Sequence, residues 1–303
     1  MPRVRATLVL RASAKINLTL HVGGQRPDGF HEVRTLLQSI ALTDRLTMTA
    51  RRGPFSLFTR APGVPVDRTN LVSRAADLLW RALGRGGEPS GVHATLEKQI
   101  PVAAGLGGGS ADAAATLLGL NVLWNARLSR RELARLGADL GSDVPFFLHG
   151  GTALGAGRGD ELYPVDDIPA FRVIVIKPSF GVSSVDAYRW LDEDRLRAPA
   201  SMKRGPSNRA NELDLGWPAG PVALVNDLQA PVSVRHPAID EMLDALVGAG
   251  ASAAAMTGSG SAVFGLFIRP VSKAGLARLA RPGWLVISTR ISHRREAVRR
   301  MGL

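Results

Sequence analysis

The stretch PVAAGLGGGSADAA, residues 101–114, decides the fold of this chain. It joins a run of glycines, Gly105 to Gly109, to Ser110 and then to an Ala- and Leu-rich segment that continues to about Trp124. Glycines let a ligand approach the backbone closely, and the N-terminus of a helix offers unpaired N–H groups to an anion. The stretch therefore predicts an anion-binding loop that leads into a helix capped by Ser110.

Two common phosphate-binding loops do not fit this stretch. A P-loop has Lys before its Ser or Thr, and Gly109 stands there. A dinucleotide-binding loop has glycine at its sixth position, which is Ser110, and its helix returns to a strand. Here Ser129 and Glu132 form the pattern of a capping box, which opens a second helix instead. A flexible linker or a simple helix-entry turn remains as the alternative to an anion site.

Upstream of the glycines, residues 15–22 (KINLTLHV) alternate between polar and apolar side chains. This period predicts a half-buried strand with Lys15 and Asn17 on its exposed face, where a solvated polar surface is the simpler interpretation of both residues. The Gly- and Pro-rich loop that follows contains Phe30 and His31. The histidine either contacts a ligand or belongs to an exposed loop.

The next segments alternate between predicted strands and helices. Residues 33–49 predict one or two strands, with a break near Asp44. Thr69 or Asn70 is placed to cap the helix that follows, and residues 92–100 predict another strand.

Asp143 precedes a short apolar helix, so an ordinary helix cap is the first interpretation of this residue. The stretch 192–220 lacks periodicity and predicts a loop or a partly helical insertion. The order of the other elements in the second half predicts an antiparallel α+β unit of the ferredoxin-like type. These are strands at 171–178, 253–256, 262–268 and 284–289, helices at 237–247 and 272–279, and a TGSGS turn at 257–261.

Length and composition indicate a folded protein of two domains. The chain has 303 residues, of which 45% are hydrophobic and 21% charged. It has no cysteine, which excludes disulfides, thiolate metal sites, iron–sulfur clusters and cysteine nucleophiles, and which is compatible with a reducing cytoplasm. No apolar run reaches the roughly 18 residues of a membrane span, so we expect a cytoplasmic protein without a membrane partner.

The net charge of +12 suggests an anionic partner. Only five of the 38 basic residues are lysines. The arginine pairs near the C-terminus, at 294–295 and 299–300, predict a solvated tail. A nucleic acid is the less favoured partner, because aromatic residues interleaved with the charges and any known RNA-binding module are absent.

Taken together, five ordered segments resemble the galactokinase, homoserine kinase and mevalonate kinase (GHMP) superfamily. Within it they resemble the family that phosphorylates a cytidine diphosphate-linked methylerythritol in the non-mevalonate isoprenoid pathway. The segments are SAKINLTL at 13–20, RPDGFHEV at 26–33, PVAAGLGGGSADAA at 101–114, LGSDVPFFLHGG at 140–151 and MTGSGSAVFGLF at 256–267. The resemblance extends over most of the chain and is weakest at 192–220.

The resemblance implies an α+β fold of two domains. An ATP-binding domain of the ribosomal protein S5 domain 2-like type would cover residues 1–165, and a ferredoxin-like domain on the substrate side would cover 166–303. ATP would lie with its phosphates over the glycine-rich loop, and Mg²⁺ would accompany it, with Ser110 as one possible ligand. The nucleotide-binding residues implied are Asn70, Pro101, Gly105, Leu106, Gly107, Gly108, Gly109, Ser110 and Ala111.

The resemblance also implies roles for polar and aromatic residues that their local patterns left open. Asp143 would act as the general base on the acceptor hydroxyl, with Lys15 orienting it and offsetting charge. The cytidine diphosphate part of the substrate would contact Asn17, Phe30, His31, Lys98 and Tyr188, with Phe30 stacked on cytosine. Another GHMP-type kinase, acting on homoserine or mevalonate, is the nearest alternative, and the oligomeric state is not predicted.

Overall fold

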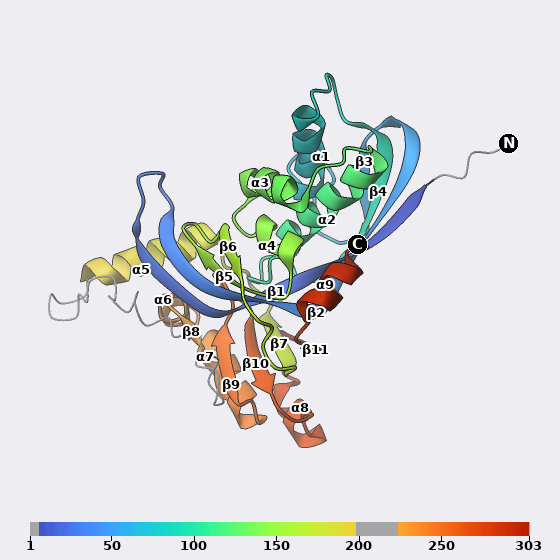
Figure 1. Cartoon of the computed structure of the whole chain (residues 1–303). Helices are drawn as coiled ribbons and strands as arrows, with labels where there is room; N and C mark the ends of the chain where they lie inside the picture. The colour runs from blue at the N-terminus through green and yellow to red at the C-terminus, as the bar shows by residue number, and fades with distance from the viewer. Residues whose placement is uncertain (1–5, 198–223, 303) are drawn as a thin grey trace.

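Two long antiparallel strands, β1 (Thr7–Gln25) and β2 (His31–Pro54), form the centre of the larger sheet (Figure 1). The computed structural model describes residues 6–197 and 224–302. The sheet runs β3-β4-β2-β1-β8, and β5 pairs with both β2 and β6. The shorter strands are β3 (Ser56–Thr59), β4 (Ser90–Glu97), β5 (Thr152–Ala156), β6 (Glu161–Pro164) and β8 (Val225–Asn226).

Four helices pack on one face of this sheet: α1 (Leu71–Ala82), α2 (Gly108–Leu123), α3 (Arg130–Leu140) and α4 (Val144–His149) (Figure 1). Leu46 and Met48 of β2 meet Leu79, Leu117 and Phe146 of the helices in one core. The predicted caps of α1 and α3 are confirmed. The Asn70 side chain accepts a hydrogen bond from the backbone N–H of Val72, and Ser129 forms a complete capping box with Glu132.

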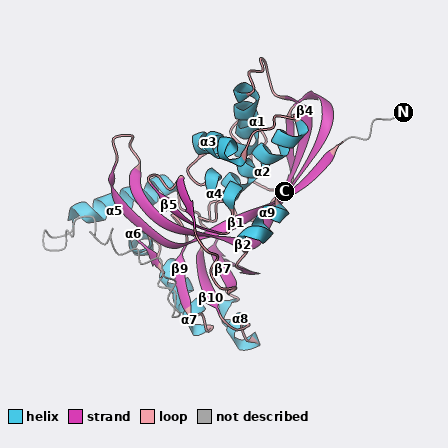
Figure 2. Cartoon of the chain, viewed as in Figure 1, coloured by secondary structure: helices cyan, strands magenta, loops and turns pink. Residues whose placement is uncertain are grey.

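The second sheet is wholly antiparallel and has the order β11-β7-β10-β9. Figure 2 labels its strands β7, β9 and β10. Its strands are β7 (Arg172–Pro178), β9 (Ala253–Met256), β10 (Val263–Phe267) and β11 (Trp284–Arg290). Numbered along the chain, these strands lie in the order 4-1-3-2, which is the ferredoxin-like arrangement that the sequence predicts. The associated helices are α5 (Ser184–Arg197), α6 (Gln229–Arg235), α7 (Ala238–Gly248) and α8 (Lys273–Leu279).

Strand β7 shows how the second sheet joins the two halves of the molecule. Ile174 and Ile176 pack on the helices of the second half, whereas Val173 and Val175 pack against Ile16 and other apolar residues of β1. Successive side chains of a strand point to opposite faces of its sheet. Because both sets of side chains are buried, the second sheet is covered on both of its faces. The continuous apolar run of β7 is the sequence signature of that double burial.

Three predictions about local structure are wrong. Lys15 and Asn17 are 3% and 4% exposed, because later segments of the chain cover the polar face of β1. Strand β2 continues through Asp44, whose buried carboxylate has partners of its own. The arginines near the C-terminus belong to helix α9 (Arg294–Arg300). The Arg294 side chain donates hydrogen bonds to the backbone carbonyls of Thr152 and Val165.

The predicted division into residues 1–165 and 166–303 stays a prediction. The second sheet lies wholly in the later half, while β8 and α9 return from that half to the first sheet. The stretch 192–220 is helical in α5 as far as Arg197, and its remainder lies outside the described residues. In the described part of the chain, no helix is both long and apolar enough to cross a membrane.

Candidate active site

A cavity of about 1100 Å³ lies where the glycine-rich loop, β1 and α5 meet. The candidate residues come from segments up to about 170 positions apart in the sequence, yet almost all of them line this one space. In the described structure only Ala111 of the predicted site lies outside the lining, buried within α2. The residues that line it are Lys15, Asn17, Phe30, His31, Asn70, Lys98, Pro101, Gly105, Leu106, Gly107, Gly108, Gly109, Ser110, Asp143 and Tyr188.

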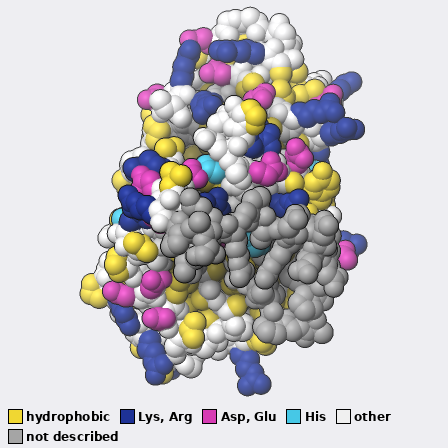
Figure 3. Space-filling view, turned by 90° about the vertical axis from the view of Figure 1, so that its left-hand side faces the viewer, with side chains coloured by type: hydrophobic (Ala, Val, Ile, Leu, Met, Phe, Trp, Pro, Cys, Tyr) yellow, Lys and Arg dark blue, Asp and Glu magenta, His cyan; other side chains and the backbone are white. Residues whose placement is uncertain are grey.

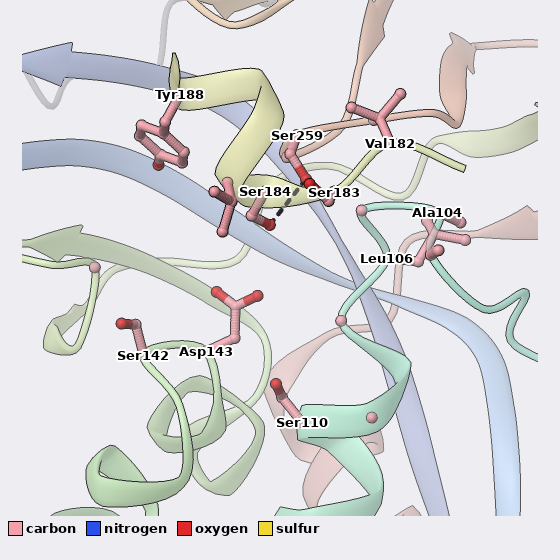
Figure 4. A pocket seen from close by; sticks show the side chains of 18 of the residues that line it. Ala104, Leu106, Ser110, Ser142, Asp143, Val182, Ser183, Ser184, Tyr188 and Ser259 are labelled. Carbon is pink, nitrogen blue, oxygen red and sulfur yellow. Dashed lines mark hydrogen bonds between the residues drawn. The ribbon is translucent and has the colours of Figure 1, made fainter. Parts of the chain in front are cut away.

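The glycine-rich loop can take its shape only because its residues lack side chains. Gly105 has φ +73°, and a Cβ there would lie 2.1 Å from the carbonyl oxygen of Thr257. Gly107 has φ +70°, and a Cβ there would lie 2.6 Å from the ring of Phe147. Gly107 is the N-cap of α2, so the predicted cap at Ser110 is wrong. Ser110 instead lies in the first turn of α2, and its side chain lines the cavity (Figure 4).

Lys15 and Asp143 form an ion pair, and both residues line the cavity. The Lys15 Nζ lies 3.6 Å from Oδ2 of Asp143, whose side chain is 38% exposed. Asp143 occupies the N-cap position of α4, but among the described residues its carboxylate makes no capping hydrogen bond. Its carboxylate and the Ser110 hydroxyl border the same open space (Figure 4). The interpretation of Asp143 as a plain helix cap is therefore wrong, and the carboxylate remains available to a ligand.

Asn17 holds Lys15 in place. Its side-chain oxygen accepts a hydrogen bond from the Lys15 Nζ at 2.6 Å, and its amide donates to Thr35 Oγ1 at 2.7 Å. The backbone N–H of Asn17 donates to Thr257 Oγ1. An ideal Cβ on Gly258 would lie 3.2 Å from the same ammonium, so the 257–261 turn closes over it. The lysine thus has little freedom to move.

Aromatic residues line another part of the cavity, and Tyr188 lies apart from Leu106 and Ser110 (Figure 4). The rings of His31 and Tyr188 are stacked with centroids 5.0 Å apart, and His31 Nε2 lies 3.0 Å from the Asp192 carboxylate. Phe30 is 50% exposed, and the Arg158 guanidinium lies 5.0 Å from its ring centroid. Burial, with a smaller contribution from Asp143, raises the pKa of Tyr188 to about 12, so its phenol keeps its proton.

Lys98 and Asn70 line the cavity, but each already has partners within the protein. The Lys98 Nζ is ion-paired with Asp44 and, at 2.7 Å, with Asp112. The Asn70 side chain accepts from Val72 N and donates to the carbonyl of Pro65. The substrate contact implied for Lys98 stays a prediction, whereas its place beside the two carboxylates is an observed feature.

Sequence reasoning missed several residues around the cavity. The Asn226 amide donates to the carbonyls of Met256 and Gly258 and so fixes the 257–261 turn. Ser184 and Ser259 are hydrogen-bonded at 3.1 Å and link α5 to this turn (Figure 4). Asn226 lies in a strand of two residues, which is too short for a periodic pattern. Ser259 belongs to the TGSGS turn that the sequence indicates, whereas no local pattern sets Ser184 apart.

The described surface on the side shown in Figure 3 carries its basic side chains in small groups interleaved with acidic ones. Many of the arginines are already paired. Arg235, for example, contacts Glu193 and Asp194, and Arg290 contacts Glu296. An arginine that is paired with a carboxylate adds no net charge, so the surplus of +12 lies on the other basic residues. On the side shown in Figure 3 these do not form one continuous basic patch, and the cavity with its glycine-rich loop is the better place to look for an anionic ligand.

Comparisons with known proteins agree with this geometry. Two family models match the chain, the GHMP kinases N terminal domain over residues 70–151 and the GHMP kinases C terminal domain over 211–280. The 4-diphosphocytidyl-2-C-methyl-D-erythritol kinase of Moorella thermoacetica is 47% identical over 86% of this chain and 90% of that protein. The kinase of the same name from Solibacter usitatus is 44% identical over 85% of this chain and 80% of that protein.

One solved structure supports the same assignment, and a second shares the fold. A crystal structure of a 4-(cytidine 5'-diphospho)-2C-methyl-D-erythritol kinase matches with a TM-score of 0.72 and 32% identity, covering 94% of this chain and 99% of the other. A homoserine kinase from Cytophaga hutchinsonii shares the fold, with a TM-score of 0.69 at 19% identity over 98% of each chain. Sequence identity over most of the chain and the shared architecture lead to one conclusion: the chain belongs to the family of 4-diphosphocytidyl-2-C-methyl-D-erythritol kinases within the GHMP kinases.

Proposed function

We propose that this chain transfers the γ-phosphoryl group of ATP to the 2-hydroxyl of 4-diphosphocytidyl-2-C-methyl-D-erythritol, giving the 2-phosphate and ADP. One observation carries the proposal. A single cavity contains a glycine-rich loop at a helix N-terminus, a Lys15–Asp143 pair and an aromatic wall. The first feature suits the phosphates of a nucleotide, the second suits proton transfer from an alcohol, and the third suits a nucleobase.

ATP would bind with its phosphates at the N-terminus of α2. The first N–H groups of a helix have no partners within the helix, and the helix dipole favours an anion there. Glycines at 105 and 107–109 leave the backbone open to close approach, and Ser110 adds a hydroxyl. Asn70 and Pro101 would border the rest of the nucleotide. The γ-phosphate would then lie on the side of the loop that faces Asp143.

Asp143 would take the proton of the acceptor hydroxyl as that oxygen attacks phosphorus. Phosphoryl transfer passes through a loose transition state, so positioning and electrostatic stabilisation supply most of the catalysis. Lys15 would serve both needs, because its ammonium is fixed by Asn17 and lies 3.6 Å from the base. As the new O–P bond forms and the bond to the ADP oxygen breaks, that ammonium offsets charge on the transferring group.

Magnesium fits the oxygen donors of this cavity when the nucleotide supplies most of the ligands. Within the described residues, no group of three or more acidic or histidine side chains could hold a metal alone. Mg²⁺ commonly keeps several waters and binds one or two protein oxygens together with substrate phosphates. Ser110 and Asp143 are the side chains placed to contribute. The ion would neutralise charge on the phosphates.

The proposed reaction is tested by measuring ADP release with a panel of acceptors, with and without Mg²⁺. We expect turnover with 4-diphosphocytidyl-2-C-methyl-D-erythritol that depends on the metal. Turnover should be lost when the cytidine group is absent or when homoserine or mevalonate replaces the substrate. Equal turnover of methylerythritol 4-phosphate would show that the aromatic wall does not select the substrate. No turnover with any acceptor would contradict the proposed function.

Replacing Phe30 by Ala is expected to raise KM for the cytidylyl substrate by about tenfold or more, because stacking of an aromatic side chain on a base contributes roughly 1–3 kcal/mol. KM for ATP should stay within about twofold, since the substitution leaves the glycine-rich loop unchanged. Steady-state kinetics with each substrate varied in turn measures both constants. Phe58→Ala is the matched control, because Phe58 is similarly exposed (46%) but lies on β3, away from the cavity lining.

A further inference from the structure

Lys15 and Asn17 lie on a short stretch of β1 between two irregularities of its pairing with β2. The register shifts between Ser13 and Lys15. It shifts again between Asn17 and Thr19. Irregularities of this kind often lie next to active sites, where they change the direction of a side chain. At the second one, the side chain of Thr35 in β2 meets the side chain of Asn17.

The hydroxyl group of Thr35 has a fixed direction. Its Oγ1 lies 2.7 Å from the backbone carbonyl oxygen of Thr19 and 2.7 Å from Nδ2 of Asn17. A carbonyl oxygen can only accept a hydrogen bond, so the single hydroxyl proton goes to Thr19. Toward Asn17 the hydroxyl therefore acts as an acceptor. Thr35 is 4% exposed, which leaves water little access to either bond.

This hydroxyl sets the orientation of the Asn17 amide. One end of an amide side chain donates and the other accepts, and the neighbouring groups decide which way each end points. Because Thr35 accepts, the NH₂ group of Asn17 points toward Thr35 and the amide oxygen points toward Lys15. The Lys15 ammonium, which can only donate, meets that oxygen at 2.6 Å. The reversed amide would place an NH₂ group against the ammonium.

Thr257 is the other hydroxyl beside the Asn17 side chain, and it constrains the amide less. Its Oγ1 lies 3.3 Å from the Asn17 amide oxygen and 3.3 Å from the carbonyl oxygen of Gly105, so its single proton has two equally distant acceptors. Hydrogen bonds between two oxygens are commonly about 2.7–2.8 Å long. The short contacts of Thr35 therefore fix the amide more tightly than the long contacts of Thr257.

The chain of contacts that begins at Thr35 ends at the proposed base. The Lys15 Nζ, which Asn17 holds, lies 3.6 Å from Oδ2 of Asp143. Thr35 borders the same cavity, but its hydroxyl already has one partner as a donor and one as an acceptor. Its influence on the reaction therefore passes through the side chains of Asn17 and Lys15.

We propose that Thr35 is a positioning residue of the active site, which acts through the Asn17 amide to hold the Lys15 ammonium in place. The inference rests on the proposed function, because it assumes that Lys15 and Asp143 act in phosphoryl transfer. Without the hydroxyl, the buried NH₂ group of Asn17 loses its acceptor, and the amide turns away from the orientation that Lys15 requires. A displacement of about 1 Å in a positioning group can lower a rate by about 10²-fold.

The test compares Thr35→Val with Thr35→Ser. Valine keeps the shape of threonine without the hydroxyl, whereas serine keeps the hydroxyl without the methyl group. We expect Thr35→Val to lower kcat by about 10- to 100-fold. Thr35→Ser should keep kcat within about threefold, and KM for ATP should stay within about twofold in both variants. Thr43→Val is the matched control with an unchanged kcat, because Thr43 is buried on the same strand and lies outside the cavity lining.

A double-mutant cycle shows whether Thr35 acts through Asn17. Asn17→Ala removes the amide itself, so adding Thr35→Val to that variant should lower kcat by no more than about a further twofold. Calorimetric titration with ADP counts the folded binding sites, and kcat is calculated per site. If Thr35→Val does not fold, Thr35→Ala takes its place, because alanine also lacks the hydroxyl.

Three results would overturn the proposal. The first is a kcat of the variant without the hydroxyl equal to that of the wild-type chain. The second is a loss in Thr35→Ser as large as the loss in Thr35→Val, which would make packing the cause. The third is a loss that adds in full to that of Asn17→Ala. Absence of turnover by the wild-type chain with every acceptor would contradict the proposed function instead.

Discussion

Replacing Asp143 by Asn is expected to lower kcat by about 10²- to 10⁴-fold, the range that a positioned general base supplies. The amide has nearly the same shape as the carboxylate, but it cannot accept the proton of the acceptor hydroxyl. Because Asp143 makes no capping hydrogen bond within the described structure, the substitution should leave α4 intact. Single-turnover measurement of ADP formation, with all reactants bound, isolates the chemical step from binding.

The control for this experiment is Asp139→Asn. Asp139 lies near the end of α3, outside the cavity lining, and should tolerate the change with kcat within about twofold. Binding of ADP by Asp143→Asn should also stay close to that of the wild-type chain, since the glycine-rich loop is unchanged. Turnover equal to that of the wild-type chain would remove Asp143 as the base.

The residues of the site could be predicted more reliably than their surroundings. The alternation at residues 15–22 correctly predicts a strand and puts Lys15 and Asn17 on one face. It could not predict that this face is buried, because the covering atoms come from Thr257 and Gly258, some 240 positions away. A periodic pattern reports which residues share a face, whereas the burial of that face depends on the tertiary structure.

Helix α2 shows the same limit on a smaller scale. A serine before an Ala- and Leu-rich run is a good cap by local preference, so the sequence predicts a helix that starts at Ser110. The glycine at 107 adopts a left-handed conformation and begins the helix earlier, which frees the Ser110 side chain for the cavity. The three consecutive glycines obscured the start of the helix, because glycine is poor in helix interiors.

The partners of Lys98 could not be found from the sequence at all. Asp44 lies 54 positions before it, at a point where the sequence suggested a break in a strand, and Asp112 lies 14 positions after it. An isolated aspartate in a predicted strand usually indicates a turn. Here Asp44 is instead a buried acceptor of hydrogen bonds from the backbone N–H groups of Gln99 and Ile100, which follow β4. Only the fold shows that the three charges belong together.

Replacing Lys98 by Met is expected to destabilise the chain by about 3–5 kcal/mol, the usual cost of removing one partner from a buried ion pair. Methionine fills a similar volume, so the loss is chiefly electrostatic. Asp44 would remain buried with only its two backbone donors, and Asp112 would have neither oxygen paired. Urea unfolding followed by circular dichroism measures the change in unfolding free energy. Lys273→Met is the control, because Lys273 lies on an exposed helix surface and should change stability by about 0.5 kcal/mol at most.

A second substitution separates the charge from the packing. Lys98→Met combined with Asp112→Leu removes one buried carboxyl along with the ammonium, so part of the lost stability should return. If Lys98→Met cost less than about 1 kcal/mol, the ion pairs of Lys98 with Asp44 and Asp112 would contribute little to stability. If the double variant were less stable than Lys98→Met alone, shape at this site would matter more than charge. Recovery in the double variant would instead show that the buried carboxyl of Asp112 makes the ammonium necessary.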